Sequence, residues 1–222
     1  KLKSLAEQED PEIQARALYL QGDVYARRGQ ITKSLQSYER LLRLHPDDSF
    51  AVEAGLSAAQ MAYSSRMYER SHHFARWVSQ RSTVRERSSI VDDDGVHRRP
   101  HKAGSAKDHS FWLLAWNEKR SGAPHQVVDS YLAKIDSTGP LAKAALYWRA
   151  RFAMDLGDHD AAEVFSELLR IKAPTSYYAL ASIDLLHHIG SAETQRRDFP
   201  VLSGEYLASK VTPKGRPFDM AA

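Results

Sequence analysis

The ten histidines of this 222-residue chain are the side chains that most readily suggest a metal site. Two adjacent pairs occur, His72–His73 and His187–His188, but neighbours on a helix point about 100° apart and suit a single ion poorly. His97 and His101 have the four-residue spacing that places two ligands on one helical face, yet Pro100 between them disfavours a helix. We therefore predict no metal site and no bound cofactor.

Segment 92–95, Asp-Asp-Asp-Gly, has the composition of a calcium-binding loop. With Gly95 at the sixth position of such a loop, Ile90 stands at the first position and His101 at the twelfth, where the loop requires an oxygen ligand and a glutamate. The sequence also contains no G-x-S-x-G elbow and no G-x-x-x-x-G-K phosphate loop. Calcium binding, serine hydrolysis and nucleotide binding therefore have no support.

Aromatic residues are the stronger candidates for a binding surface. Trp112 and Trp116 lie four residues apart, and therefore on one helical face, while Tyr147 and Trp148 follow in a later helix. Such rings can stack on sugars or contact a partner, and packing between helices is the alternative. The adjacent pair Tyr177–Tyr178 must place one ring toward the core of any helix. The candidate glycan- or partner-binding residues are Trp112, Trp116, Trp148, Tyr177 and Tyr178.

Composition narrows the function classes further. The chain is 42% apolar and 27% charged, as soluble globular proteins are, and it has no cysteine for disulfides, thiolate metal sites or thiol catalysis. Its net charge of +3 arises entirely within 81–107, where the basic run Arg98–Lys102 lacks interleaved aromatics. No apolar run reaches the roughly 18 residues of a membrane span. We expect neither a nucleic-acid partner nor a membrane span.

Apolar residues recur with helical spacing throughout the chain. The sustained alternation of apolar and polar residues that is typical of strands is absent. Gly29 separates two such helices, and Pro46 ends the second. The pattern then recurs, with turns predicted at Gly29, Arg66, Gly122, Gly157 and Gly190. The steps between these turns are 37, 56, 35 and 33 residues, and an insertion of about 20 residues explains the long one.

Small residues recur at fixed distances from these turns. Seven residues before a turn the sequence has Gly22, Ala59, Ala115, Ala150 and Ile183, and five residues after it Ser34, Ser71, Val127, Ala162 and Gln195. Small side chains let the backbones of two helices approach closely, and neighbouring hairpins must then stack to bury their apolar faces. The period near 34 resembles the tetratricopeptide repeat. We predict an all-α fold, a superhelical array of antiparallel helical hairpins.

Four segments follow from these patterns. N-terminal hairpin repeats are expected over 1–82, a polar basic insertion forming a mobile loop over 83–107, C-terminal repeats over 108–200, and an irregular tail or linker over 201–222. Because the chain begins with Lys1, we expect it to be a piece of a longer protein.

The C-terminal repeats have a more specific resemblance. The run A-x-Y-W-R-A-R at 145–151, followed by P-T-S-Y-Y-A-L-A at 174–181, resembles the superhelical, non-catalytic region of soluble lytic murein transglycosylases. That family's catalytic glutamate precedes a serine, in a helix before a Gly-Leu-Met-Gln stretch. This sequence contains neither motif. The resemblance therefore implies a fragment without the active site.

Two functional hypotheses remain open. In the first, the chain is the helical scaffold of a bacterial lytic transglycosylase, a peptidoglycan lyase of the periplasm or cell envelope that cleaves MurNAc-GlcNAc bonds to 1,6-anhydro products. The scaffold would hold glycan strands or a downstream catalytic domain and would not be catalytic alone. In the alternative, it is a stand-alone tetratricopeptide-like adaptor for a peptide or protein, with Lys33 and Arg40 as candidate partners for a ligand carboxylate.

Overall fold

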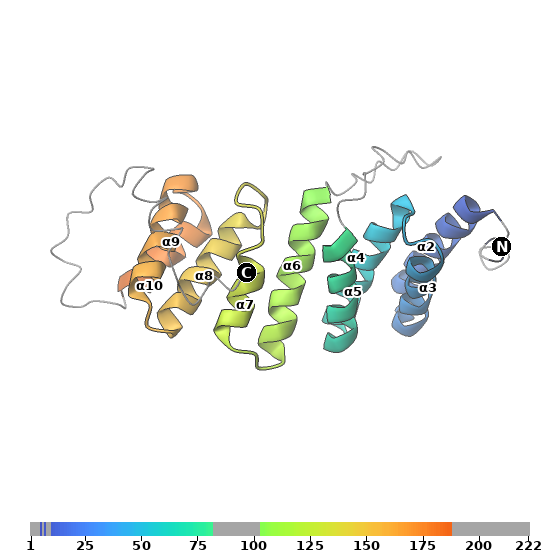
Figure 1. The fold of residues 1–222 in the computed structure, drawn as a ribbon, viewed down its shortest axis with the longest axis horizontal. Coiled ribbons are helices and arrows are strands. Elements are labelled where there is room, and N and C mark those ends of the chain that lie inside the picture. Colours follow the sequence, from blue (N-terminus) through green and yellow to red (C-terminus); the bar gives the residue numbers. More distant parts are fainter. Residues whose placement is uncertain (1–4, 6, 8–9, 82–102, 188–222) are drawn as a thin grey trace. The chain divides into compact units, whose positions relative to one another are not determined.

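The computed structural model describes residues 5, 7, 10–81 and 103–187. Within these residues every regular element is a helix, which confirms the all-α prediction. The chain divides into two compact units, unit 1 (Lys1–Arg120) and unit 2 (Ser121–Ala222), and each is described by itself. In each unit the helices lie side by side in chain order (Figure 1).

The described part of unit 1 consists of two antiparallel hairpins and one further helix. Its helices are α2 (Pro11–Arg27), α3 (Ile31–Leu44), α4 (Ser49–Ser64), α5 (Tyr68–Arg81) and α6 (Ala103–Arg120). Asp10 and Asp48 cap α2 and α4, because their carboxylates accept hydrogen bonds from backbone N–H groups in the first turn. α3 ends two residues before Pro46, as the sequence predicts.

Unit 2 repeats the same plan over its described residues. Its helices are α7 (His125–Leu132), α8 (Ala142–Asp155), α9 (His159–Lys172) and α10 (Tyr177–His187). Asp158 caps α9 by accepting a hydrogen bond of 3.0 Å from the Ala161 N–H, and Pro174 follows the end of α9 by two residues. α8 and α9 form a hairpin, and α10 follows as the first helix of the next predicted hairpin.

The predicted turn positions adopt the left-handed backbone conformation. Gly29, Gly122 and Gly157 have φ values of 69°, 82° and 76°. Arg66, the one turn position without glycine among those described, has the same conformation with φ of 61°. A left-handed residue closes a helix and reverses the chain, which is why glycine recurs here. Gly190 lies outside the described residues.

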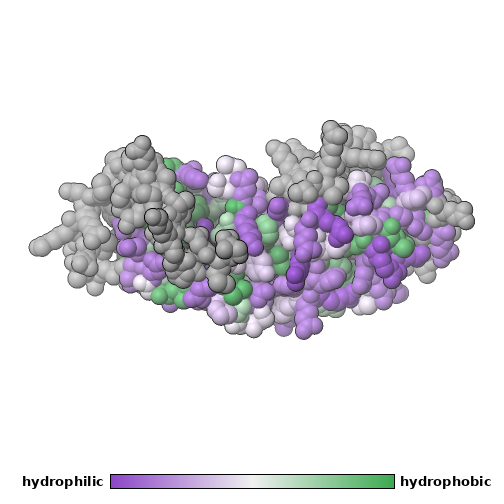
Figure 2. Space-filling view, in the orientation of Figure 1, coloured by the Kyte–Doolittle hydropathy of each residue, from purple (hydrophilic) through white to green (hydrophobic). Residues whose placement is uncertain are grey.

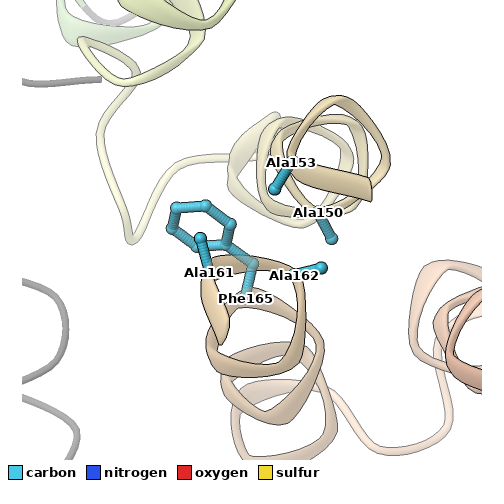
Figure 3. Close-up of a cluster of buried hydrophobic side chains, with 5 residues drawn as sticks. All are labelled: Ala150, Ala153, Ala161, Ala162 and Phe165. Carbon is cyan, nitrogen blue, oxygen red and sulfur yellow. The ribbon is translucent and has the colours of Figure 1, made fainter. Parts of the chain in front are cut away.

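Small residues bring the two helices of each hairpin together. A Cβ atom added to Gly22 would lie 2.4 Å from Cε1 of Tyr38. In unit 2, Ala150 and Ala153 of α8 face Ala161 and Ala162 of α9, beside Phe165 (Figure 3). The predicted small-residue positions are therefore the places where the helices cross.

Successive hairpins stack through their first helices. In unit 1, α2 contacts α4 and α4 contacts α6, while α3 packs on α4 and α5 packs on α6. In unit 2, α8 contacts α10 in the same way. We call α2, α4, α6, α8 and α10 the first helices and α3, α5, α7 and α9 the second helices. This arrangement within each unit is a helical repeat array.

The predicted segment boundaries differ from the structure in two respects. Residues 108–120 of α6 were expected among the C-terminal repeats but belong to unit 1. The insertion was expected to run as a loop from 83 to 107, but its last five residues are helical because α6 begins at Ala103. Residues 83–102, the end of the predicted repeats from 188 to 200, and the tail at 201–222 lie outside the described residues. None of the described helices has the length and apolar character that spanning a membrane requires.

Candidate functional site

The first helices of unit 1 share one face, which the contacts between α2 and α4 define. The Tyr19 hydroxyl donates a hydrogen bond of 2.7 Å to the Glu53 carboxylate, and the ring centroids of Tyr19 and Phe50 lie 5.1 Å apart. Tyr19 stands ten residues before its turn, Gly29. Positions ten residues before a turn therefore lie on the side of a first helix that faces its neighbour.

Trp112 of α6 stands at this same repeat position, ten residues before Gly122. Its ring meets that of Trp116 edge to face, with centroids 5.4 Å apart, and both rings are half-buried. The prediction that these two tryptophans share one helical face is confirmed by this contact. A pair of partly exposed indoles offers a broad apolar contact area of fixed shape.

A basic residue stands at the end of α6. Interaction with the Tyr63 hydroxyl of α4 raises the pKa of the Arg120 guanidinium further above its usual value. Arg120 itself is exposed to solvent. The C-terminal end of α6 therefore carries a permanent positive charge.

Aromatic side chains of unit 2 form a continuous series of ring contacts between α8 and α10. The centroid distances are 5.9 Å from Phe152 to Trp148, 5.6 Å from Trp148 to Tyr147, and 5.8 Å from Tyr147 to Tyr178. Tyr178 in turn lies 5.5 Å from Tyr177. The series joins a buried ring, Phe152, to a solvent-exposed ring, Tyr177, whose exposed fraction is 75%.

The predicted binding residues thus fall into two groups. Trp112 and Trp116 belong to unit 1, and Trp148, Tyr177 and Tyr178 belong to unit 2. As expected for adjacent helical residues, Tyr178 packs against a neighbouring helix while Tyr177 faces solvent. On the face seen in Figure 2, hydrophilic residues dominate the described surface, and apolar residues form small separate areas.

A buried ion pair in unit 2 was not predicted. The Asp129 side chain of α7 is fully buried, and its Oδ1 accepts a hydrogen bond of 2.9 Å from Nε of Arg149 on α8. Burial raises the pKa of the Asp129 carboxyl above its usual value, and the nearby Arg149 opposes this. The Arg149 guanidinium also lies 4.4 Å from the ring centroid of Phe165.

This pair gives part of the A-x-Y-W-R-A-R segment a structural role. Arg149, the arginine that follows the tryptophan in that segment, neutralises Asp129 instead of facing a ligand. The only feature of the sequence that indicates a buried carboxylate is the position of Asp129 in an apolar stretch, between Val128 and Leu132. Its partner, 20 residues away on another helix, left no recognisable spacing.

The other polar residues that the sequence analysis considered do not form a common site among the described residues. Lys33 and Arg40 both lie on α3, a second helix, where the Lys33 ammonium is 5.8 Å from the Tyr25 ring centroid. Nε2 of His72 lies 3.2 Å from the Glu118 carboxylate. Among the described residues, no group of three or more His, Cys, Asp or Glu side chains could hold a metal ion. His97, His101, His188 and the segment 92–95 lie outside the described part of the chain, as does the side chain of His187.

Comparison with known protein families identifies the repeats. Two tetratricopeptide repeat models match, one over residues 15–48 and the other over 125–176. The first match covers the α2–α3 hairpin, and the second covers α7 to α9. Searches of curated proteins and of solved structures gave no match. The chain is therefore an all-helical protein that carries tetratricopeptide repeats, stacked within each unit as a helical array.

Proposed function

We propose that the chain is a scaffold or adaptor, each unit of which binds a polypeptide partner along its first helices. In unit 1 the contact residues are Trp112 and Trp116, and in unit 2 they are Tyr147 and Arg151. The observation that carries this proposal is the surface that these side chains leave exposed at corresponding positions, whereas Tyr19 at the tenth position before Gly29 is buried against α4. Trp112 and Tyr147 each stand ten residues before a turn, and Trp116 and Arg151 each stand six residues before it.

The chemistry of these side chains suits a protein partner. All three rings are partly exposed, so their remaining surface is available to an apolar group of a ligand. Arg151 is exposed, and its guanidinium lies 5.8 Å from the Trp148 ring centroid. Aromatic and arginine side chains dominate binding energies at protein interfaces, because they combine large apolar area with directed hydrogen bonds. Tetratricopeptide repeats generally mediate protein interactions, which supports the same class of partner.

A display library of random peptides, selected on the full chain, tests the adaptor proposal. Affinities of the enriched peptides are then measured for the wild type and for Trp112→Ala and Trp116→Ala. We expect each variant to weaken binding by about 30-fold or more, which corresponds to the loss of an interface hot spot. Trp77→Ala is the matched control, because Trp77 is a half-buried tryptophan like the other two but lies on α5, a second helix. Binding that depends equally on Trp77, or enrichment of no peptide, would contradict the proposal.

A scaffold within a lytic transglycosylase is the second candidate, and one contact favours it. The two segments that carry the resemblance to that family, 145–151 and 174–181, touch through the rings of Tyr147 and Tyr178. Aromatic rings can also stack on sugars, so the ligand would be a peptidoglycan glycan strand. This candidate would place the chain in the periplasm or cell envelope.

Cosedimentation with purified peptidoglycan sacculi separates the two candidates. The second candidate requires that the chain sediments with sacculi, that Trp116→Ala reduces this binding, and that the supernatant contains no anhydro-muropeptides. Absence of sedimentation would reject the second candidate and leave the adaptor. Release of anhydro-muropeptides would show that the chain has an active site of its own, against both proposals.

A further inference from the structure

The second helices of unit 1 concentrate positive charge. Within residues 10–81, α3 and α5 together carry six cationic side chains and two carboxylates, which gives these two helices a net charge of +4. The other residues of this range carry four cationic side chains and six carboxylates, for a net charge of −2. The nearly balanced total therefore consists of two regions of opposite net charge. We call the cationic side chains of these two helices the α3–α5 cations: Lys33, Arg40, Arg43, Arg70, Arg76 and Arg81.

The hairpin architecture does not require this charge. α7 and α9, the second helices of unit 2, carry two cationic side chains and four carboxylates, and so have a net charge of −2. The buried residues at which a second helix crosses its first helix are small in both units, as Ser34 and Ala162 show. The positive charge is therefore a property of unit 1 that packing does not explain.

Three of the α3–α5 cations form a stripe along α3. Lys33, Arg40 and Arg43 are spaced by seven and three residues, which places them within about 80° of one another around the helix. Lys33 and Arg43 are exposed and Arg40 is half-buried, whereas Leu35 and Leu41 on the other side of α3 are fully buried. The stripe spans about 15 Å, because each helical residue advances about 1.5 Å. Lys33 and Arg40, which the sequence suggests as partners for a ligand carboxylate, thus lie on one accessible surface.

One ion pair joins α3 to α5 on this surface. Nη2 of Arg70 lies 3.2 Å from Oε2 of Glu39, and both side chains are partly exposed. An arginine of this surface thus already binds a carboxylate between the two helices. Among the described residues, Arg70 is the only α3–α5 cation in an ion pair. The like charges of the others repel one another, and an anionic ligand would offset this repulsion.

The aromatic rings beside these cations do not suit nucleic acid. Single-stranded nucleic acids bind basic grooves largely by stacking their bases on accessible aromatic rings. The Tyr38 ring of α3 is only 2% exposed, and the Tyr68 ring of α5 meets a ring of α4 edge to face. The Trp77 ring of α5 has the Arg81 guanidinium 4.7 Å from its centroid, and a Cβ atom added to Gly55 of α4 would lie 3.3 Å from the same ring. Carboxylates need no ring, and guanidinium groups bind them through two parallel hydrogen bonds. An acidic polypeptide is therefore the better fit.

We propose that the outer surface of α3 and α5 binds an acidic segment of a protein partner, whose carboxylates pair with the α3–α5 cations. An extended chain advances about 3.4 Å per residue, so the stripe on α3 matches a run of about four or five residues. This surface belongs to second helices, whereas Trp112 and Trp116 belong to a first helix. Unit 1 therefore has a second binding surface, distinct from that of the tryptophan pair.

Fluorescence anisotropy of a labelled peptide of eight glutamates, titrated with the full chain, tests the proposal. We expect a Kd of about 10–100 µM at about 50 mM salt, which rises about tenfold at about 200 mM because exposed charges are screened. Arg40→Glu/Arg43→Glu should weaken binding by about tenfold or more, since it removes two cations and adds two carboxylates. Lys143→Glu/Lys172→Glu is the matched control, because both lysines are exposed in unit 2 and the net charge changes equally. It should change the Kd by less than about twofold.

An oligothymidylate with eight phosphates, titrated in parallel, distinguishes the two classes of anion. Tighter binding of this oligonucleotide than of the peptide, lost in Arg40→Glu/Arg43→Glu, would show that the surface binds phosphate polymers and would overturn the proposal. Absence of peptide binding at low salt would also overturn it. So would an equal loss in the control variant, because net charge alone would then explain the binding.

Because the chain has no cysteine, a single introduced cysteine can locate the bound peptide. Gln36 is exposed on α3 between Lys33 and Arg40, and Gln36→Cys labelled with benzophenone should crosslink to the glutamate peptide on irradiation. Gln60→Cys, at an exposed position of the first helix α4, should not. Crosslinking at residue 60 alone would place the acidic segment on the first helices, against the proposal. No outcome depends on the tryptophan pair, so failure here is distinguishable from failure of the proposed function.

Discussion

The Ser34 hydroxyl donates a hydrogen bond of 2.7 Å to the backbone carbonyl of Gly22, from the second helix of the first hairpin to its first helix. Thirty-seven residues later, Ser71 makes the same bond of 2.9 Å to the carbonyl of Ala59. Both serines are fully buried. The first two hairpins therefore share a hydrogen bond between their two helices as well as the position at which these helices cross.

These two serines should differ in their contribution to stability. Ser34→Ala removes one buried donor while the Gly22 carbonyl keeps its helical partner, so we expect a loss of about 1 kcal/mol in the free energy of unfolding. Ser71→Ala should cost about 2 kcal/mol, because the Ser71 oxygen also accepts a hydrogen bond of 2.9 Å from the buried Asn117 amide. Urea unfolding of the two variants measures the difference, and equal losses would contradict it.

Arg66 at the turn between α4 and α5 is predicted to destabilise unit 1. A non-glycine residue in the left-handed conformation costs about 1 kcal/mol, and glycine avoids this cost. Arg66→Gly should therefore raise the free energy of unfolding by about 1 kcal/mol. Arg28→Gly is the control, because Arg28 precedes the equivalent turn and has an ordinary φ of −88°. It should be neutral or slightly destabilising, since glycine gains nothing there and makes the unfolded chain more flexible.

The buried pair in unit 2 predicts a pH-dependent defect. Arg149→Met leaves the Asp129 carboxylate buried without its counter-ion and should cost about 3–5 kcal/mol near neutral pH. Loss of Arg149 also raises further the pKa of Asp129, which burial already raises. A carboxyl whose pKa is higher in the folded state binds more protons when folded, so its contribution to stability is lost as the pH rises through that pKa. The defect should shrink as the pH is lowered from about 7 to about 5.

Two further variants control this measurement. Asp129→Asn combined with Arg149→Met should remove the pH dependence, because no titratable group remains in the pair. Arg170→Met breaks the partly exposed pair between Arg170 and Glu167 and should cost at most about 1 kcal/mol at any pH. A defect of Arg149→Met that stays constant over this range would mean that Asp129 does not titrate there.

For binding, the half-buried tryptophan pair predicts non-additive losses. Trp112 and Trp116 contact each other, so removal of either ring also changes the shape that the other presents. The double variant Trp112→Ala/Trp116→Ala should therefore weaken a selected peptide by less than the product of the two single effects. Isothermal titration calorimetry of the four proteins measures this coupling. Strict additivity would indicate that the two rings bind independently.

Most of the repeat architecture could be predicted from the sequence, because the residues that determine it lie within one hairpin. The turns at Gly29, Gly122 and Gly157 and the small residues near them depend on backbone sterics within one hairpin, and the structure confirms them. Arg66 could be placed only by counting from its neighbours, and it too adopts the expected conformation.

The features that spacing could not predict depend on contacts between helices. Asp129 and Arg149 form an ion pair between two helices. Neither residue's type or position in the sequence indicates which residue its partner is. Periodicity also assigns Ile183 to a buried crossing position, yet its exposed fraction is 36%. The polar composition of 83–107 predicts a loop through Lys107, whereas α6 begins at Ala103.

The stacking of hairpins within each unit also determines how the protein folds. The strongest contacts among the described helices join elements that are consecutive or next but one in the chain. Contact order is therefore low, and little chain entropy is lost before the first contacts form, so rapid folding of each hairpin onto its neighbour is expected. The same locality allows the ends of the array to open while its interior stays folded. Hydrogen exchange should consequently be slowest in helices covered on both sides, such as α4, and faster in α2, which has a helical neighbour on one side only among the described residues.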